Sequence, residues 1–427
     1  MFSDQREELL SVDPSTLCDR YEERQLSTDS RLAQVVIGVR RSGKSTLCEK
    51  FLRGRGVAFA YANFDDDRLQ ALRTDDFDAV LEALYQIYGD FSHLFLDEIQ
   101  NVPRWQLFVN RLLRRRLHLF ITGSNSRLLS GELTTHLTGR HHRVELYPLS
   151  FAEYATLKGV DMQSVSTKSK ALRMKALTDY LHEGGFPELM HEPDRRGYIE
   201  ALLNSIIRND IGRRFRVRYV ETLRRLAAYL SDNFCQEFVA TATAELFGVS
   251  DHTIDNYYSY LKQAFLLIGI PKFSYKSRDR VRYEKVYVVD VALVSEREGA
   301  FSPDNMGWRL ENTVCVELLR RHRSTYADVF YYRDRQWAVD FLVARNGRVE
   351  ELIQVAYDIS SPKVLRRELR ALLKAAEKFA CPRLTLINFF DDRLEHVGAH
   401  TIHIVSAAQW LSKTEPDPTE GEQGATP

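Results

Sequence analysis

The chain has 427 residues, enough for several domains with separate hydrophobic cores. Its 59 basic and 59 acidic residues cancel, which excludes a uniformly charged surface, so any nucleic-acid-binding surface must be local. Five scattered cysteines without paired spacing argue against a disulfide framework and a zinc site. No apolar run approaches the length of a membrane span, and the amino terminus lacks the pattern of a signal peptide. We therefore expect a cytoplasmic protein with no membrane partner.

The first predicted strand, Ala33 to Ile37, leads into the loop G-V-R-R-S-G-K-S. This is the Walker A pattern, because its glycines let successive backbone N–H groups point at phosphates from a helix N-terminus. Lys44 is expected to reach the β- and γ-phosphates of ATP, and Ser45 to complete a Mg²⁺ shell. The predicted nucleotide-binding residues are Gly38, Val39, Arg40, Arg41, Ser42, Gly43, Lys44, Ser45 and Thr46.

A second strand is predicted over Val57 to Ala62, and we interpret the acidic cluster after it, Asp65 to Asp67, as a solvated turn rather than a metal site. The next apolar strand, beginning at Leu94, ends in Asp97 and Glu98, which is the Walker B pattern. Hydrolysis needs both acids at a strand tip, with Asp97 holding the Mg²⁺ shell and Glu98 polarising the attacking water.

Another buried strand, Leu117 to Thr122, is followed by two polar residues, Ser124 and Asn125. Either one fits a sensor of the γ-phosphate, and an ordinary turn after the strand is the competing interpretation. Arg140 precedes the strand Val144 to Leu146 and is the best candidate for an arginine finger, usually supplied by a neighbouring subunit; a simple basic turn is the alternative. Strands that alternate with helices predict a parallel sheet with ligands at its carboxyl edge.

Several segments resemble the bacterial and archaeal AAA+-type ATPases that carry a C-terminal DUF4143 region (the AAA_14/DUF4143 family). They are G-V-R-R-S-G-K-S-T-L, L-F-L-D-E-I-Q-N-V-P-R-W, F-I-T-G-S-N-S-R-L-L-S-G-E-L, L-T-G-R-x-x-R-V-E-L-Y-P-L-S-F-x-E-Y and G-G-F-P-E. The fold class expected from the pattern and the resemblance is α/β: a P-loop ATPase core with a parallel sheet, a helical lid, a winged helix and a restriction-endonuclease-like α/β domain. We place the core at 1–165, the lid at 166–230, the winged helix at 231–300, the degenerate PD-(D/E)xK domain at 301–412 and a disordered acidic tail at 413–427.

The middle of the chain predicts a helix–turn–helix, Thr241 to Phe247 and Asp251 to Ala264, with Thr253, Asn256, Tyr257 and Tyr260 on the polar side of the second helix. A basic, tyrosine-containing segment follows and would be the wing of a winged helix. Its possible nucleic-acid contacts are Lys272, Lys276, Arg278, Arg280 and Arg282. Winged helices of such ATPases also serve as lids or as docking modules for proteins, and that alternative stays open.

The last third has the order of a restriction-endonuclease-like domain, as the resemblance also implies. Glu311 lies on a predicted helix, Asp340 on a strand, and Gln354 and Ala356 on the next strand. An active nuclease of this class needs two acids, or an acid and Gln, for its metal and a lysine two residues on. Since Ala356 stands at the lysine position, we expect a catalytically degenerate site.

The pattern thus predicts an ATP-binding and ATP-hydrolysing enzyme with Mg²⁺ as cofactor, whose nucleotide state controls binding to nucleic acid, DNA before RNA. Two alternatives remain: a nucleotide-gated switch or scaffold for a protein partner, and an active ATP-dependent nuclease. The pair Asp97 and Glu98 favours hydrolysis over binding alone, and Ala356 argues against the nuclease. If Arg140 acts in trans, the protein must form a homo-oligomer.

Overall fold

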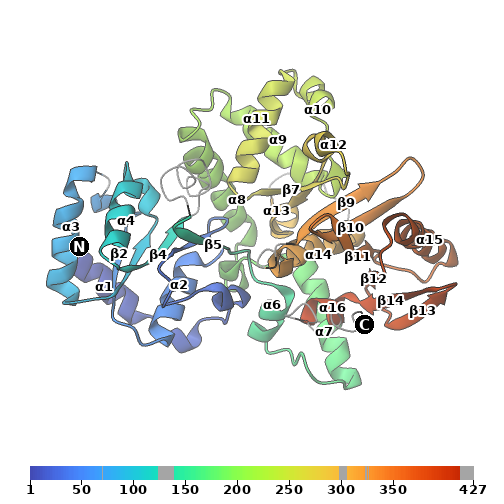
Figure 1. Cartoon of the computed structure of the whole chain (residues 1–427), viewed down its shortest axis with the longest axis horizontal. Coiled ribbons are helices and arrows are strands. Elements are labelled where there is room, and N and C mark those ends of the chain that lie inside the picture. Colours follow the sequence, from blue (N-terminus) through green and yellow to red (C-terminus); the bar gives the residue numbers. More distant parts are fainter. Residues whose placement is uncertain (70, 124–138, 298–304, 323–324, 326, 414–427) are drawn as a thin grey trace. The chain divides into compact units, whose positions relative to one another are not determined.

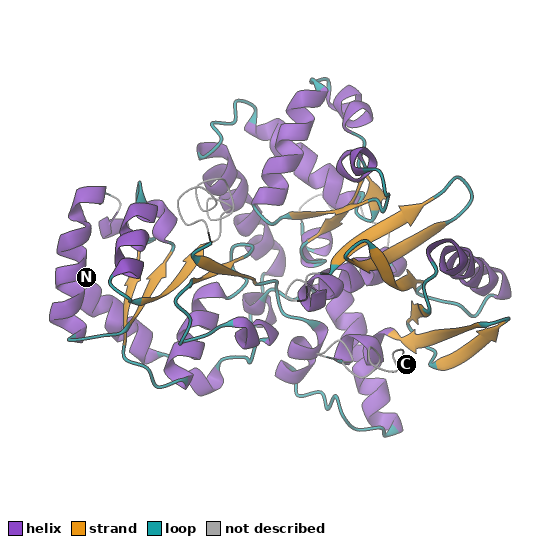
Figure 2. Cartoon of the chain, in the orientation of Figure 1, coloured by secondary structure: helices purple, strands orange, loops and turns teal. Residues whose placement is uncertain are grey.

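The computed structural model describes residues 1–69, 71–123, 139–297, 305–322, 325 and 327–413 (Figures 1 and 2). The chain forms two compact units, which are described separately. The first comprises residues 1–148 with 263–265, and it ends before residue 165, where the sequence places the end of the ATPase core. The second comprises 149–262 and the described residues from 266 onward. Among the described residues, no helix combines the length and the apolar character that crossing a bilayer requires.

The first unit is built on a parallel sheet of five strands in the order β2-β3-β4-β1-β5. The strands are β1 (Ala33–Ile37), β2 (Phe59–Asn63), β3 (His93–Asp97), β4 (His118–Gly123) and β5 (His141–Glu145). The helices are α1 (Phe2–Ser11), α2 (Lys44–Gly54), α3 (Phe77–Tyr88) and α4 (Trp105–Arg114). Strand β4 lies between β1 and β3 and is parallel to both, so the loop after β1 and the end of β3 lie at the same edge of the sheet. This arrangement confirms the predicted α/β core.

Helices cover both faces of this sheet, and the alternation along β1 shows how (Figure 2). Val35 and Ile37 belong to a core formed with α3 and α4, whereas Val36 belongs to a second core formed with α2. Successive side chains of a strand point to opposite faces, so a strand covered on both sides is buried along its whole length and is mostly apolar. All five residues of β1, and all five of β3, are buried.

The second unit begins with helices and a small antiparallel sheet in the order β6-β8-β7. Its helices are α6 (Phe151–Leu157), α7 (Thr167–Glu183), α8 (Arg195–Ser205), a π-helical stretch (Ile206–Arg213), α9 (Val220–Asp232), α10 (Ala240–Phe247), α11 (Asp251–Gln263), α12 (Ser277–Arg282) and α13 (Ala292–Ser295). The strands are β6 (Gln236–Glu237), β7 (Leu267–Pro271) and β8 (Glu284–Val288). Part of the basic segment predicted as a wing is therefore the short helix α12.

The carboxyl-terminal part of this unit is a six-stranded sheet in the order β13-β14-β12-β11-β10-β9. Its strands are β9 (Asp328–Arg333), β10 (Ala338–Arg345), β11 (Arg348–Val355), β12 (Arg383–Asn388), β13 (Arg393–Val397) and β14 (His400–Ser406), and its helices are α14 (Met306–His322), α15 (Pro362–Phe379) and α16 (Ala407–Ser412). Asn346 and Gly347 both have positive φ, of 52° and 78°, so this Asn-Gly pair makes the tight turn of the β10–β11 hairpin. The hairpin brings Asp340 of β10 close to Gln354 of β11.

Candidate nucleotide-binding and hydrolysis site

The loop between β1 and α2 folds closely against the chain that leaves β5. Gly38 has φ of 155°, and a Cβ atom on it would lie 2.1 Å from the Leu146 carbonyl oxygen. Gly43 has φ of 92° and caps the N-terminus of α2, where the first N–H groups of a helix lack intrahelical partners. Both glycines of the pattern therefore lie at positions that disfavour any other residue. The loop places the N-terminus of α2, with its free N–H groups, where a phosphate can bind.

Two side chains of the loop fit a phosphate group. Lys44 is buried and donates from Nζ to the Val39 carbonyl oxygen at 2.9 Å, so its charge lies over the loop. The Ser42 hydroxyl is buried and has no hydrogen-bond partner within the described part of the chain. Such an orphaned hydroxyl gains a partner when a phosphate oxygen enters the loop. The residues present therefore fit a bound nucleotide.

Asp97 lies at the end of β3, and three hydroxyl groups converge on its carboxylate. Ser45 donates to Oδ1 at 2.9 Å, Thr122 donates to the same oxygen, and Tyr61 donates to Oδ2 at 3.2 Å. Burial raises the pKa of Asp97 to about 6, with a further contribution from the Glu98 charge, although the three hydrogen bonds oppose the rise. A buried carboxylate and a hydroxyl at this edge form the oxygen donor set that Mg²⁺ prefers.

Glu98 follows directly and has φ of 51°, a left-handed conformation that is uncommon outside glycine. Its carboxylate accepts a hydrogen bond from the Gln100 amide, and its backbone N–H donates to the Thr122 hydroxyl at 3.3 Å. Backbone strain of this kind concentrates at functional sites. The structure thus brings together Lys44, Ser45, Asp97 and Glu98.

Besides Gln100, which contacts Glu98, three residues of this site were not among the sequence predictions. Thr122 and Tyr61 hold Asp97, and Arg20 donates to the Ser42 carbonyl oxygen at 2.9 Å and to that of Tyr147 at 2.6 Å. Thr122 is a polar residue at the end of an apolar strand, so a signal was present for it. Neither Tyr61 nor Arg20 carries a local sequence signal, because each reaches the site only through the tertiary fold.

The structure separates the remaining candidates. Ser124 and Asn125 lie outside the described residues. Arg140 is exposed and precedes β5, whose first residue, His141, pairs with Ala33 at the beginning of β1. Since the strands are parallel, Arg140 lies at the amino edge of the sheet, opposite the loop after Ile37.

Asp65 in the acidic turn after β2 is exposed but paired with the loop. Its carboxylate lies 3.5 Å from the Arg40 guanidinium and accepts a hydrogen bond from Asn101 at 3.2 Å. Asp65 and Asp67 are exposed as expected of a solvated turn, whereas Asp66 is half-buried and accepts hydrogen bonds from Gln5 and Arg68, and the turn also contacts the nucleotide-binding loop.

In the second unit, Lys276, Arg278 and Arg282 of the basic segment are exposed, whereas Arg280 donates to the Ser274 carbonyl oxygen at 2.5 Å and Lys272 lies 5.6 Å from the Tyr283 ring centre. The prediction for α11 is wrong in one respect. Tyr257 is buried, and Tyr260 stacks on Phe215 with ring centres 3.8 Å apart, so neither tyrosine is displayed for a partner. The rings of Tyr257 and Tyr260 are thus used for packing inside the second unit.

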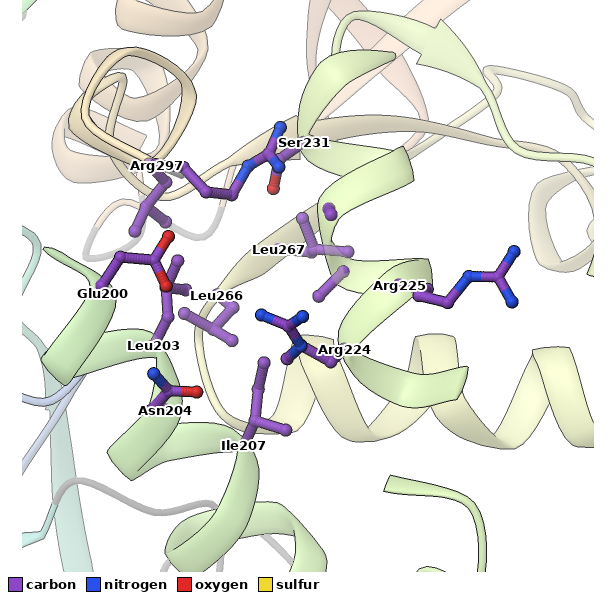
Figure 3. Close-up of a pocket in the computed structure, with 13 residues that line it drawn as sticks. Glu200, Leu203, Asn204, Ile207, Arg224, Arg225, Ser231, Leu266, Leu267 and Arg297 are labelled. Carbon is purple, nitrogen blue, oxygen red and sulfur yellow. The ribbon is translucent and has the colours of Figure 1, made fainter. Parts of the chain in front are cut away.

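A cavity of about 130 Å³ in the second unit lies among α8, the π-helical stretch, α9, β7 and α13 (Figure 3). Its walls include Leu203, Ile207 and Leu266, and Arg224 points into it, whereas Arg225 points away (Figure 3). None of the predicted site residues lines this cavity.

Comparisons with known proteins place the chain in a family. Residues 30–155 match the AAA domain, and residues 174–304 match the domain of unknown function DUF8612. A Methanocaldococcus jannaschii protein, described as uncharacterized protein MJ1544, is 33% identical over 393 residues, covering 88% of this chain and 87% of its own. An uncharacterized protein of Haemophilus influenzae is 33% identical over 399 residues, covering 90% and 95%. The chain belongs to this family of AAA-domain proteins.

The DUF4143 region that the resemblance implied is not confirmed, since the match in the middle of the chain is to DUF8612. Among solved structures, the Walker-type ATPase PABY2304 of Pyrococcus abyssi is 17% identical, with a TM-score of 0.40 over 66% of this chain and 96% of its own. The RuvB Holliday junction branch migration motor of Thermotoga maritima is 18% identical, with a TM-score of 0.28 over 62% and 89%.

The raised pKa of Asp97 predicts a stability effect in this AAA-domain protein. The folded state retains a proton that the unfolded state releases between about pH 4 and pH 6, so the free energy of unfolding falls across this window and stays lowered above it. Without nucleotide, Asp97→Asn should raise the free energy of unfolding at pH 8 by on the order of 1–3 kcal/mol, and by less at pH 5. Denaturant unfolding at both pH values measures this.

The exposed residue Asp90 supplies the matched control, because Asp90→Asn removes a charge from the same unit without relieving burial. A lower stability of Asp97→Asn than of wild type at pH 8 would contradict the prediction.

Proposed function

We propose that this protein is a Mg²⁺-dependent ATPase whose nucleotide state controls binding to DNA. The observation that carries the hydrolytic part is the convergence of Ser45, Thr122 and Tyr61 on Asp97, with Glu98 beside it and the Walker A loop at the same edge. A protein that only bound nucleotide would have no need of a second, strained carboxylate next to the metal ligand.

Each residue of the site has a separate task. Lys44 and the N-terminus of α2 bind and orient the phosphates. Ser45 and Asp97 would hold the nucleotide's Mg²⁺, which would supply positive charge against the phosphates. Glu98 orients and polarises the attacking water. Gln100 fixes the Glu98 carboxylate by a hydrogen bond, and Thr122 ties the Glu98 backbone to Asp97.

Glu98→Gln keeps the shape of the side chain and removes the carboxylate. We expect ATP binding to be retained within a few-fold, while kcat falls by roughly 10²-fold or more, because only the activation of water is lost. Steady-state phosphate release and equilibrium binding of a fluorescent ATP analogue separate the two effects.

Glu82 lies exposed on α3, so Glu82→Gln is the control and should leave both quantities unchanged. Turnover of Glu98→Gln equal to wild type would remove Glu98 from the mechanism.

We further propose that Arg140 serves the nucleotide of a neighbouring subunit in a homo-oligomer. The support is its exposed position at the amino edge of the sheet, opposite the edge that carries its own loop. A guanidinium that enters from another chain can neutralise charge developing on the γ-phosphate.

A mixing experiment tests this proposal. Arg140→Ala and Glu98→Gln chains should each be nearly inactive alone. Mixed, they should regain part of the ATPase rate, because Glu98→Gln chains supply Arg140 to the intact sites of Arg140→Ala chains. Wild-type turnover by Arg140→Ala alone, or a mixture no more active than its parts, would count against a finger in trans.

For DNA binding, the support comes from element order and charge. The order α9, β6, α10, α11, β7, β8 is that of a winged helix, with the segment 272–283 between the last two strands as its wing. The wing exposes Lys276, Arg278 and Arg282, whereas the exposed face of α11 carries Asp251 and Asp255. Phosphates are attracted to the former and repelled by the latter, so we assign the contact to the wing.

Replacing two of these cations tests the assignment. Lys276→Ala with Arg278→Ala should weaken binding to duplex DNA by roughly tenfold at 0.1 M salt and reduce the salt slope by about 2, because two phosphate contacts are lost. Fluorescence anisotropy at several salt concentrations measures both.

Lys168 and Lys170 are exposed on α7, and their double alanine variant is the control of equal charge. Tighter binding of RNA than of DNA would shift the proposal to RNA. Binding that is absent, or indifferent to salt, would favour a nucleotide-gated switch for a protein partner.

A further inference from the structure

A buried ammonium group lies between the two acids predicted for the degenerate nuclease site. Lys285 of β8 places Nζ 2.6 Å from Oε1 of Glu311 on α14 and 3.6 Å from Oδ1 of Asp340 on β10. The three side chains are only 15%, 11% and 14% exposed. The small antiparallel sheet thus contributes a cation to a pair of carboxylates that belong to the six-stranded sheet and its helix.

Several other polar groups around this pair are also hydrogen-bonded. Tyr287 donates its hydroxyl to Oε1 of Glu311 at 2.7 Å, and the Val355 backbone N–H donates to Oδ2 of Asp340 at 2.9 Å. The Gln354 side chain accepts from the Asp340 N–H at 3.3 Å and donates to Glu368 at 2.7 Å. Gln354, expected as a possible metal ligand, is therefore occupied by two hydrogen bonds within the protein.

Charge explains why the lysine is held there. Two carboxylates removed from water repel each other, and burial together with Asp340 raises the pKa of Glu311, while Lys285 opposes the rise. Burial alone would lower the pKa of Lys285, yet Glu311 and Asp340 raise it above its ordinary value, so the ammonium stays charged. A divalent cation would serve the same electrostatic purpose, at the same place.

We propose that Lys285 is a built-in cation, whose ammonium group takes the position of a divalent metal between Glu311 and Asp340, so that this site binds no metal and instead fixes β8 to α14 and β10. Ala356 leaves the site without the lysine that nucleases of this class use in catalysis. Lys285 supplies a positive charge at this site, in a structural role.

The ion pairs of Lys285 with Glu311 and Asp340 also affect the basic segment 272–283, which immediately precedes β8. At one end, the Phe273 N–H donates to the Tyr331 carbonyl oxygen of β9 at 2.7 Å, and at the other end, Lys285 is paired with Glu311 and Asp340. The segment is therefore attached near both of its ends to the six-stranded sheet or its helix.

Terbium luminescence tests the proposal, because Tb³⁺ prefers oxygen ligands, as Ca²⁺ and Mg²⁺ do, and is sensitised by a nearby tyrosine such as Tyr287. The full-length chain is used with Asp97→Asn, which removes the ligand beside Tyr61. With Lys285 in place, we expect no saturable signal that depends on Asp340. Lys285→Met, introduced into the Asp97→Asn chain, should create a saturable luminescence signal several-fold above that of Asp97→Asn alone. A further Asp340→Asn substitution in that chain should abolish the signal.

A saturable signal with Lys285 present that Asp340→Asn removes would overturn the proposal, and this comparison does not require a lysine variant to fold. So would a well-folded Lys285→Met protein that gains no signal. Incubation of supercoiled DNA with Mn²⁺ adds a second readout, since cleavage by wild type that Lys285→Met abolishes would make the lysine catalytic and refute its structural role.

Discussion

The Asp97 carboxylate is kept out of water at the carboxyl edge of the first sheet, and the surrounding site depends on how that charge is tolerated. Hydroxyl groups from α2, β2 and β4 reach it, so three elements that meet only in the folded state must be in register. The arrangement is costly without a cation, because a buried carboxylate loses its hydration. A buried carboxylate of this kind lowers stability, and such losses of stability are common at functional sites.

Much of the first unit could be predicted from sequence because its signals are local. The apolar runs of β1 and β3 and the two glycines of the loop follow from steric and burial requirements that act within a few residues. Arg20 and Tyr61 could not be predicted, since one lies far before the loop and the other looks like an ordinary strand residue. Their roles arise from the strand order β2-β3-β4-β1-β5, which the sequence does not state.

In the second unit, too, the contacts that could not be predicted join residues that are far apart in the sequence. Glu311, Asp340 and Gln354 were selected in order along the chain, and the structure brings them together as expected. Lys285 lies at the end of a basic stretch, and nothing in its local sequence distinguishes it from the exposed cations Arg278 and Arg282. Strand β8 turns this one residue inward, between acids that come later in the chain, and the alternation of a strand gives no hint of which acids it will meet.

Arg20 has a mechanical consequence. Its guanidinium holds the carbonyl of Ser42 in the loop and the carbonyl of Tyr147, the residue before Pro148, at which the first unit ends. The Leu146 carbonyl also lies against Gly38, where only a hydrogen atom fits. The loop and the chain after β5 are therefore joined by two hydrogen bonds from one guanidinium group, so a displacement of the loop would also displace the last residues of the first unit. Arg20 thus links the Walker A loop to the carboxyl-terminal end of the unit that contains it.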